Sequence, residues 1–215
     1  MEIFVHFDTF VTAFPNNANQ RNVSTNFMSS YRITKYDPSK RNEQGHYLDN
    51  SDWTAISDIG KPQYNNVTYE EYEEIESAYV AAIKSIMQDN NLLFLTVDSL
   101  ELHDKKQDFI KYEKTGRLRN ISIDFDKEVK SLKNGLQLNT SEIDKIIRLI
   151  LRETVWMLLV NKDFEVRFGY DYYMYVKSAN LKQETIHKIE TSKLFVEPEV
   201  EQIKYIFTDD DGNEI

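Results

Sequence analysis

The sequence predicts an α+β fold, in which a mixed or antiparallel sheet packs against two main helices. Two segments, at about residues 68–89 and 140–159, have the three- and four-residue apolar spacing of amphipathic helices. Shorter segments alternate apolar and polar residues, a pattern typical of half-buried strands. Because 40% of the 215 residues are apolar, the chain can bury a core without covalent cross-links, and we expect one domain over residues 1–215.

The first part of the chain predicts two strands and a long connection. Residues 2–14 form the first predicted strand, within an N-terminal extension that covers residues 1–30. A second strand, at about 31–36, ends at an Asp-Pro pair that favours a turn. Residues 38–67 contain glycine, proline and several asparagines and predict a long irregular connection, which in a compact domain is usually functional or mobile.

Each main helix begins with a capping box, in which two side chains three residues apart bond each other's backbone N–H groups. Thr68 and Glu71 form the first box, and Asn139 and Glu142 form the second. After the second box, isoleucines, leucines and a valine make a wide apolar stripe that continues to about residue 159. We therefore expect this second helix to be the central helix of the core.

The remaining predicted elements are shorter than the two main helices. The sequence predicts strands at residues 92–102, 118–125 and 194–196, a helical turn or two at 125–132, a helix near 181–191 and a mobile acidic tail at 207–215. Together these elements complete a single core, without an internal repeat or a clear domain boundary.

The segment FGYDYYMYVKS, residues 168–178, places four tyrosines within six positions. If it is one continuous strand, Tyr170 and Tyr172 face the core, and Asp171, Tyr173 and Tyr175 stand on the opposite face. Alternatively, residues 169–171 form the turn of a hairpin. Exposed tyrosines make good recognition surfaces, because each combines a large rigid ring with one hydroxyl. In the other interpretation, a helix covers this face and only the hydroxyls reach its edge.

The connection within residues 47–62 holds a second group of candidate binding residues. Trp53 lies in this turn-rich segment without the spacing of a core residue, and Asp58 follows it closely. Loops on a rigid scaffold often carry binding residues, so both are predicted contacts. Alternatively, Trp53 attaches the loop to the core and the acids cap turns, or Asp52 and Asp58 bind a hard cation.

The charge of the chain indicates what kind of partner it would attract. The net charge is −10 and is concentrated, since residues 49–76 contain eight acids and one base, and residues 197–215 contain seven acids and one base. Such a field repels nucleic acid and acidic membranes and attracts basic proteins. The acidic charge can equally serve solubility, and Glu70, Glu73 and Glu74 can serve to stabilise the first turns of a helix.

Several function classes are excluded or disfavoured. Without cysteine, the chain has no disulfide, no thiol catalysis and no cysteine-ligated metal. The four histidines are scattered, and the serine-hydrolase, dinucleotide and Walker phosphate motifs are missing. No apolar run is long enough to span a membrane, and the N-terminus lacks the features of a secretory leader. We therefore expect a cytoplasmic protein without a metal or a cofactor, which contacts neither nucleic acid nor membrane directly.

Six segments between Tyr31 and about Glu197 carry a resemblance to known proteins. They are YRITKYDPSKRNEQGHY, WTAISDIGK, TYEEYEEIESAYVAAI, LILRETVW, FGYDYYMYV and LFVE. In these segments the chain resembles a group of small, largely uncharacterised bacterial proteins of the Firmicutes type. Proteins of this group are similar in size and charge to the immunity proteins of toxin systems and to phage-encoded inhibitors. By that analogy, the resemblance implies an inhibitor of another protein.

These observations lead us to expect an acidic, protein-binding inhibitor, either a toxin immunity protein or an anti-defence protein, rather than an enzyme. Its partner would be a basic protein, such as a nuclease or another nucleic-acid-binding enzyme, which it occludes. The predicted contact residues are Trp53, Asp58, Asp171, Tyr173 and Tyr175, with Glu70, Glu73 and Glu74 steering the partner. The main alternative is a small enzyme in which Asp52, Asp58 or Asp171 acts on a polar substrate together with a tyrosine. A third interpretation is a structural or regulatory subunit.

Overall fold

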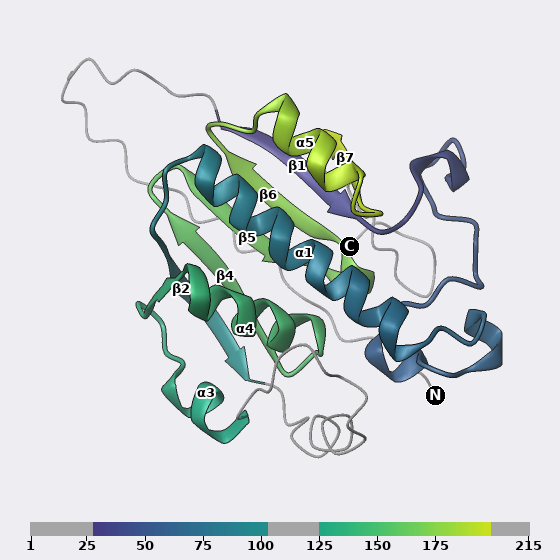
Figure 1. Ribbon diagram of the computed structural model, residues 1–215, viewed down its shortest axis with the longest axis horizontal. Helices are drawn as coiled ribbons and strands as arrows, with labels where there is room; N and C mark the ends of the chain where they lie inside the picture. Colours follow the sequence, from purple (N-terminus) through teal and green to yellow (C-terminus); the bar gives the residue numbers. More distant parts are fainter. Residues whose placement is uncertain (1–27, 103–124, 199–215) are drawn as a thin grey trace, which may run out of the picture.

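The structure is a computed structural model, which describes residues 28–102 and 125–198 (Figure 1). A sheet of seven antiparallel strands forms its centre, in the order β3-β2-β4-β5-β6-β1-β7. The predicted α+β class is confirmed, and the sheet is of the antiparallel kind. The predicted strand at 2–14, nearly all of the one at 118–125 and the tail at 207–215 lie outside the described residues.

Alternate side chains of the central strands are buried, as the two-residue period of a strand requires. The strands predicted at 31–36, 92–102 and 194–196 are confirmed, each with bounds within two residues of the prediction. The seven strands are β1 (Ser29–Thr34), β2 (Phe94–Leu102), β3 (Gln137–Asn139), β4 (Val155–Asn161), β5 (Phe164–Phe168), β6 (Met174–Ser178) and β7 (Phe195–Pro198).

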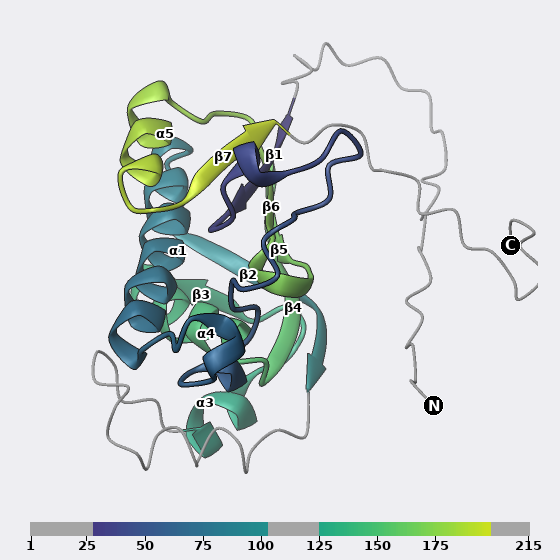
Figure 2. The same ribbon diagram turned by 90° about the vertical axis from the view of Figure 1, so that its right-hand side faces the viewer.

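Three helices cover one face of this sheet, and Figure 2 shows them as a layer beside it. The described helices are α1 (Tyr69–Asp89), α3 (Phe125–Ser131), α4 (Thr140–Leu151) and α5 (Gln183–Glu190), of which α1, α4 and α5 form the layer. Both predicted capping boxes are confirmed, since the Thr68 backbone N–H donates to the Glu71 carboxylate over 2.7 Å and that of Asn139 donates to the Glu142 carboxylate over 2.8 Å. The helices predicted near 125–132 and 181–191 are confirmed as well.

The second main helix ends at Leu151, so the prediction that it continues to about residue 159 was wrong. The chain leaves the helix through Glu153, which has a left-handed backbone with φ 57°, and the Thr154 N–H donates to the Leu149 carbonyl over 3.0 Å. This helix ending usually places glycine at the left-handed position, and a glutamate there gives no such signal. The apolar residues that follow form β4, whose alternate side chains are buried between neighbouring strands and helices.

A buried group of charges joins the two main helices. Glu76 of α1 is completely buried, and Arg148 and Arg152 at the end of α4 are each 4% exposed. The Arg152 guanidinium donates to both carboxylate oxygens of Glu76 over 2.7 and 3.0 Å, and Arg148 donates to one of them. Because the carboxylate is fully hydrogen-bonded, this cluster can stay charged away from water.

The Glu76→Gln variant should be much less stable than the wild type. It removes the carboxylate that two buried guanidinium groups share, and breaking such a cluster costs about 3–5 kcal/mol of unfolding free energy. Chemical denaturation followed by circular dichroism measures this loss. The matched control is Glu74→Gln on the same helix, whose exposed ion pair with Lys193 is worth less than about 1 kcal/mol. Equal losses in the two variants would contradict the role given to Glu76.

Candidate functional site

The tyrosine-rich segment forms a hairpin and not a continuous strand. It joins β5 to β6 through a tight turn, in which the Tyr173 N–H donates to the Tyr170 carbonyl over 3.1 Å. Both central residues, Asp171 and Tyr172, have positive φ values, 54° and 63°. This pattern belongs to the hairpin turn that favours Asn-Gly or Asp-Gly, so aspartate suits the first position, whereas the bulky Tyr172 is strained at the second. The turn therefore stores backbone strain at one end of the sheet.

The side chain of Tyr172 holds this strained turn in place. It is 5% exposed, and its hydroxyl donates to the Leu151 carbonyl over 2.7 Å. The same hydroxyl lies 3.2 Å from that of Tyr72, and the Tyr79 hydroxyl donates to the Tyr172 carbonyl. The Trp53 ring packs edge-on against the Tyr172 ring, with centroids 5.0 Å apart. Contacts from α1, α4 and the long connection thus fix the one turn.

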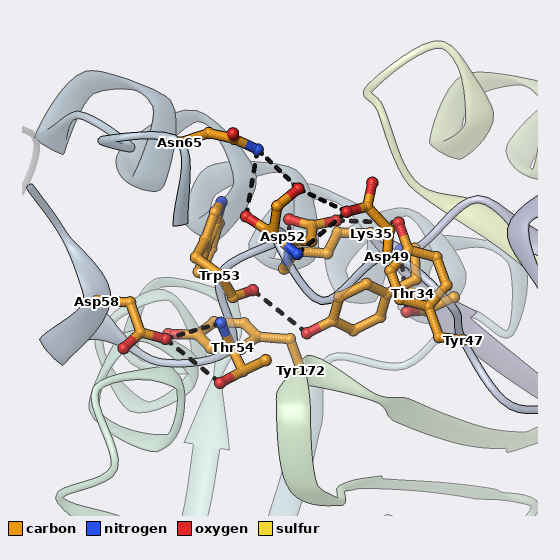
Figure 3. Close-up of polar contacts among 12 residues, drawn as sticks. Thr34, Lys35, Tyr47, Asp49, Asp52, Trp53, Thr54, Asp58, Asn65 and Tyr172 are labelled. Atoms are coloured by element: carbon orange, nitrogen blue, oxygen red, sulfur yellow. Dashed lines mark hydrogen bonds and ion pairs between the residues drawn. The ribbon is translucent and has the colours of Figure 1, made fainter. Parts of the chain in front are cut away.

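The long connection between β1 and α1 is folded onto the same end of the sheet. Its residues are tied to β1 through Lys35, whose ammonium lies 2.6 Å from the Asp52 carboxylate and about 4 Å above the rings of Tyr36 and Trp53 (Figure 3). The Tyr47 hydroxyl donates to the other oxygen of Asp52 over 3.2 Å. Burial lowers the pKa of Lys35 to about 8, although Asp52 opposes this shift.

Asp58 caps a turn inside this connection. Its carboxylate accepts hydrogen bonds from the backbone N–H groups of Thr54 and Ala55, over 3.0 and 3.1 Å, and pairs with Lys61 over 3.0 Å. Burial opposes its ionisation, but these donors outweigh burial and lower the pKa of Asp58. Asp58 and Trp53, whose positions are shown in Figure 3, are therefore both buried, with 4% and 7% of their surface exposed.

A cleft of about 310 Å³ opens beside the strained turn, and we call it the Asp171 cleft. Most of its wall is apolar or aromatic, while two carboxylates and an exposed tyrosine ring supply its polar character. Its lining residues are Thr54, Ala55, Ile150, Leu151, Glu153, Val155, Trp156, Phe168, Gly169, Tyr170, Asp171 and Tyr172. The indole N–H of Trp156 donates to the Phe168 carbonyl over 2.7 Å, which fixes that ring in the wall.

The carboxylate of Asp171 is an exposed polar group of this cleft that has no partner among the described residues. Within residues 28–102 and 125–198 it makes no hydrogen bond and no ion pair. Partial burial raises the pKa of Asp171, nearby Glu153 and Asp58 raise it further, and Lys35 opposes them. The ion pair of the Lys35 ammonium is with Asp52, and Lys35 acts on Asp171 only through its charge. A carboxylate in this position is available to a ligand that carries positive charge.

The two predicted tyrosines beyond the turn lie on the face of the sheet opposite the helices. The Tyr173 hydroxyl accepts a hydrogen bond from Arg41 over 3.1 Å, and the guanidinium groups of Arg41 and Arg32 lie 5.4 Å from its ring centre. The Arg167 guanidinium lies 4.3 Å from the ring centre of Tyr175. Both rings are half-buried by arginines of the same chain. They do not line the Asp171 cleft.

The predicted steering acids are divided over the first turns of α1. Glu70 is exposed, whereas Glu73 is 7% exposed and belongs to the interior. Glu74 is exposed and pairs with Lys193 of the loop before β7 over 2.7 Å. Glu74 also lines a second cavity of about 270 Å³, together with Trp53. Of the predicted site residues, the Asp171 cleft thus contains Asp171 alone.

Sequence reasoning missed Glu153, Trp156 and Tyr170 as members of this cleft. Glu153 and Trp156 were missed because the second main helix was predicted to continue through them. Tyr170 was missed because it would face the core if residues 168–178 formed one continuous strand. Recognising the helix end would have revealed them, but the glutamate at the left-handed position masks that end. Lys35 gives no such signal, since its burial depends on the ring of Trp53 in the long connection as well as on its neighbour Tyr36.

No group of three or more histidine or acidic side chains suited to a metal ion occurs within the described ranges. Among the helices of the described part of the chain, none combines the length and the apolar character needed to cross a membrane. Comparisons with models of protein families, with curated proteins and with solved structures gave no match to this chain. The resemblance to small bacterial proteins therefore stays a hypothesis.

The stability of the protein should fall steeply as the pH rises above about 10. Burial is the main cause that raises the pKa of the buried tyrosines around the turn, namely Tyr36, Tyr72, Tyr79 and Tyr172. Unfolded tyrosines lose their protons near pH 10, whereas these keep them in the folded state, so the unfolded state binds fewer protons and gains stability.

Urea denaturation at a series of pH values, with tyrosinate absorbance recorded in parallel, measures this effect. We expect tyrosinate absorbance from these residues to appear together with unfolding. Gradual ionisation in a protein that keeps its circular dichroism spectrum would contradict the buried positions of the hydroxyls.

Proposed function

We propose that this protein is an acidic binding protein that inhibits a basic, nucleic-acid-acting enzyme by occluding it, as toxin immunity and anti-defence proteins do. The Asp171 cleft carries this proposal. It presents a carboxylate without a partner among the described residues, a second acid at Glu153 and the ring of Tyr170, which is 72% exposed. Aromatic rings such as that of Tyr170 are enriched at the centres of protein–protein interfaces.

The rigidity of the cleft supports a role in binding. Asp171 and Glu153 both have left-handed backbones, with φ values of 54° and 57°, and the buried Tyr172 fixes the turn that carries Asp171. Strained conformations of this kind concentrate at functional sites. Because the backbone that carries the carboxylate is already held in place, a partner loses less free energy in ordering this turn.

The charge of the chain supports a basic partner. The net charge is −10, and exposed acids such as Glu70 lie at the start of α1. Long-range attraction of this kind accelerates association and orients the two proteins before contact. A nucleic-acid-acting enzyme supplies the matching positive surface, since it must neutralise phosphates.

A carboxylate-dependent enzyme is the second candidate, and the raised pKa of Asp171 in a cleft is the observation that favours it. Among residues 28–102 and 125–198, those that line the cleft include no histidine or lysine to form an acid–base pair with Asp171. Lys35 and Asp52 lie close by, but they bond to each other and do not line the cleft. We therefore rank binding above catalysis.

Capture from a host lysate, followed by mass spectrometry, should isolate a basic enzyme whose action on nucleic acid stops when the wild-type protein is added in equal amount. The double variant Asp171→Asn/Glu153→Gln should bind that enzyme at least about tenfold more weakly, because contacts to charged interface groups are worth about 2–5 kcal/mol. Glu184→Gln, an exposed charge change on α5, is the matched control and should bind like the wild type.

Two further measurements on the captured complex test the proposal. The association rate should fall as salt is added, since screening weakens the attraction between exposed charges. The variant Tyr173→Ala/Tyr175→Ala, which alters the opposite face of the sheet, separates a contact there from one at the cleft. A captured partner that stays fully active, or an association rate that salt does not change, would contradict the proposed inhibition.

A further inference from the structure

We infer that the Asp171 cleft is the binding site for an arginine side chain of the partner protein. This inference rests on the proposed function, and it names the chemical group that the site recognises. An arginine side chain offers a flat, positively charged guanidinium at the end of an apolar stem. The shape of the cleft, the chemistry of its wall and the arginine sites inside the same molecule support this assignment.

The cleft has the size and the lining that such a side chain needs. Its volume of about 310 Å³ is comparable to that of small ligand pockets, and it is open on one side. Ile150, Leu151 and Val155 can contact the apolar stem, and the rings of Trp156 and Tyr170 can contact the face of the guanidinium. A guanidinium can donate two parallel hydrogen bonds to one carboxylate, and Asp171 offers both of its oxygens.

The same chain already combines arginine, carboxylate and tyrosine elsewhere. Arg32 donates to both oxygens of Glu197 over 3.0 Å each, and its guanidinium lies 5.4 Å from the ring centre of Tyr173. Arg41 approaches the same ring from the long connection and also contacts Glu197. The Asp171 cleft has the carboxylate and the tyrosine ring of such a group. Among the described residues that line it, there is no arginine or lysine.

A lysine side chain fits this cleft less well than arginine. An ammonium enclosed between aromatic rings loses its proton more easily. In this molecule, burial lowers the pKa of Lys35 to about 8, even though Asp52 lies beside it. Arginine keeps its charge in such surroundings, since its pKa is far higher and its guanidinium is more weakly hydrated. At the Asp171 cleft, a guanidinium can also stack on an aromatic ring and donate two hydrogen bonds to one carboxylate, which an ammonium cannot do.

An NMR titration of the full chain tests this inference without the partner. The probes are N-acetyl-arginine amide, the citrulline analogue, which has the same shape without charge, and the lysine analogue. We expect the arginine probe to shift the backbone amide signals of residues 169–173 and the indole signal of Trp156, with a Kd on the order of millimolar. The lysine analogue should bind several-fold more weakly, and the citrulline analogue should cause no saturable shift.

The variants Asp171→Asn and Tyr170→Ala show whether the named groups carry the binding. Asparagine tolerates the left-handed backbone at position 171, and the Tyr170 ring is mostly exposed, so both variants should keep the wild-type fold and spectrum outside the cleft. Each should weaken binding of the arginine probe, Asp171→Asn by at least about tenfold. Glu184→Gln should leave binding unchanged.

Three results would overturn the inference: shifts that miss the cleft, equal binding of the citrulline analogue, or an Asp171→Asn variant that binds arginine like the wild type. None of them bears on whether a captured enzyme is inhibited. If inhibition is found and the arginine probe fails, the proposed function stands and the partner contacts the protein by other groups. If the probe binds as expected but no basic enzyme is inhibited, the proposed function fails instead.

Discussion

The buried hydroxyl of Tyr172 is the contact on which the arrangement of the site depends. It joins the hairpin between β5 and β6 to the last carbonyl of α4 and to Tyr72 of α1. The backbone carbonyl of Tyr172 accepts a hydrogen bond from Tyr79, about two helical turns further along α1. The turn that brings the Tyr172 ring to these partners contains two residues with a left-handed backbone, Asp171 and Tyr172. Neither is glycine or asparagine, the residues that adopt this backbone most easily. The position of Asp171 beside the cleft therefore follows from the contacts that hold Tyr172.

The acidic residues of this molecule fall into groups with different physical tasks. Glu76 neutralises two buried guanidiniums, Asp58 caps a turn and Asp52 holds Lys35. Each is satisfied within the fold, so it contributes to folding and offers little to a partner. Asp171 differs because it is an exposed residue in the lining of the cleft and is unpaired in the described part of the chain. Net charge alone could not make this distinction, which depends on the neighbours of each carboxylate.

Much of the fold could be predicted from local patterns, and the site could not. Capping boxes fixed the starts of α1 and α4, and alternation located β1, β2 and β7. The end of α4 was missed because Glu153 stands where glycine usually signals a stop, and tertiary pairing with β2 and β5 then decides that the apolar residues after it form a strand. Trp53 was predicted as a contact and is interior, because only the folded connection brings it to Tyr172.

The two left-handed acids have a consequence for how the sequence can change. At positions 153 and 171 glycine would relax the main chain, and asparagine would do so in part. Selection for heat resistance alone would therefore favour both replacements and, with them, the loss of the negative charge at this end of the sheet. The two carboxylates at these places are therefore kept at a cost to the stability of the main chain.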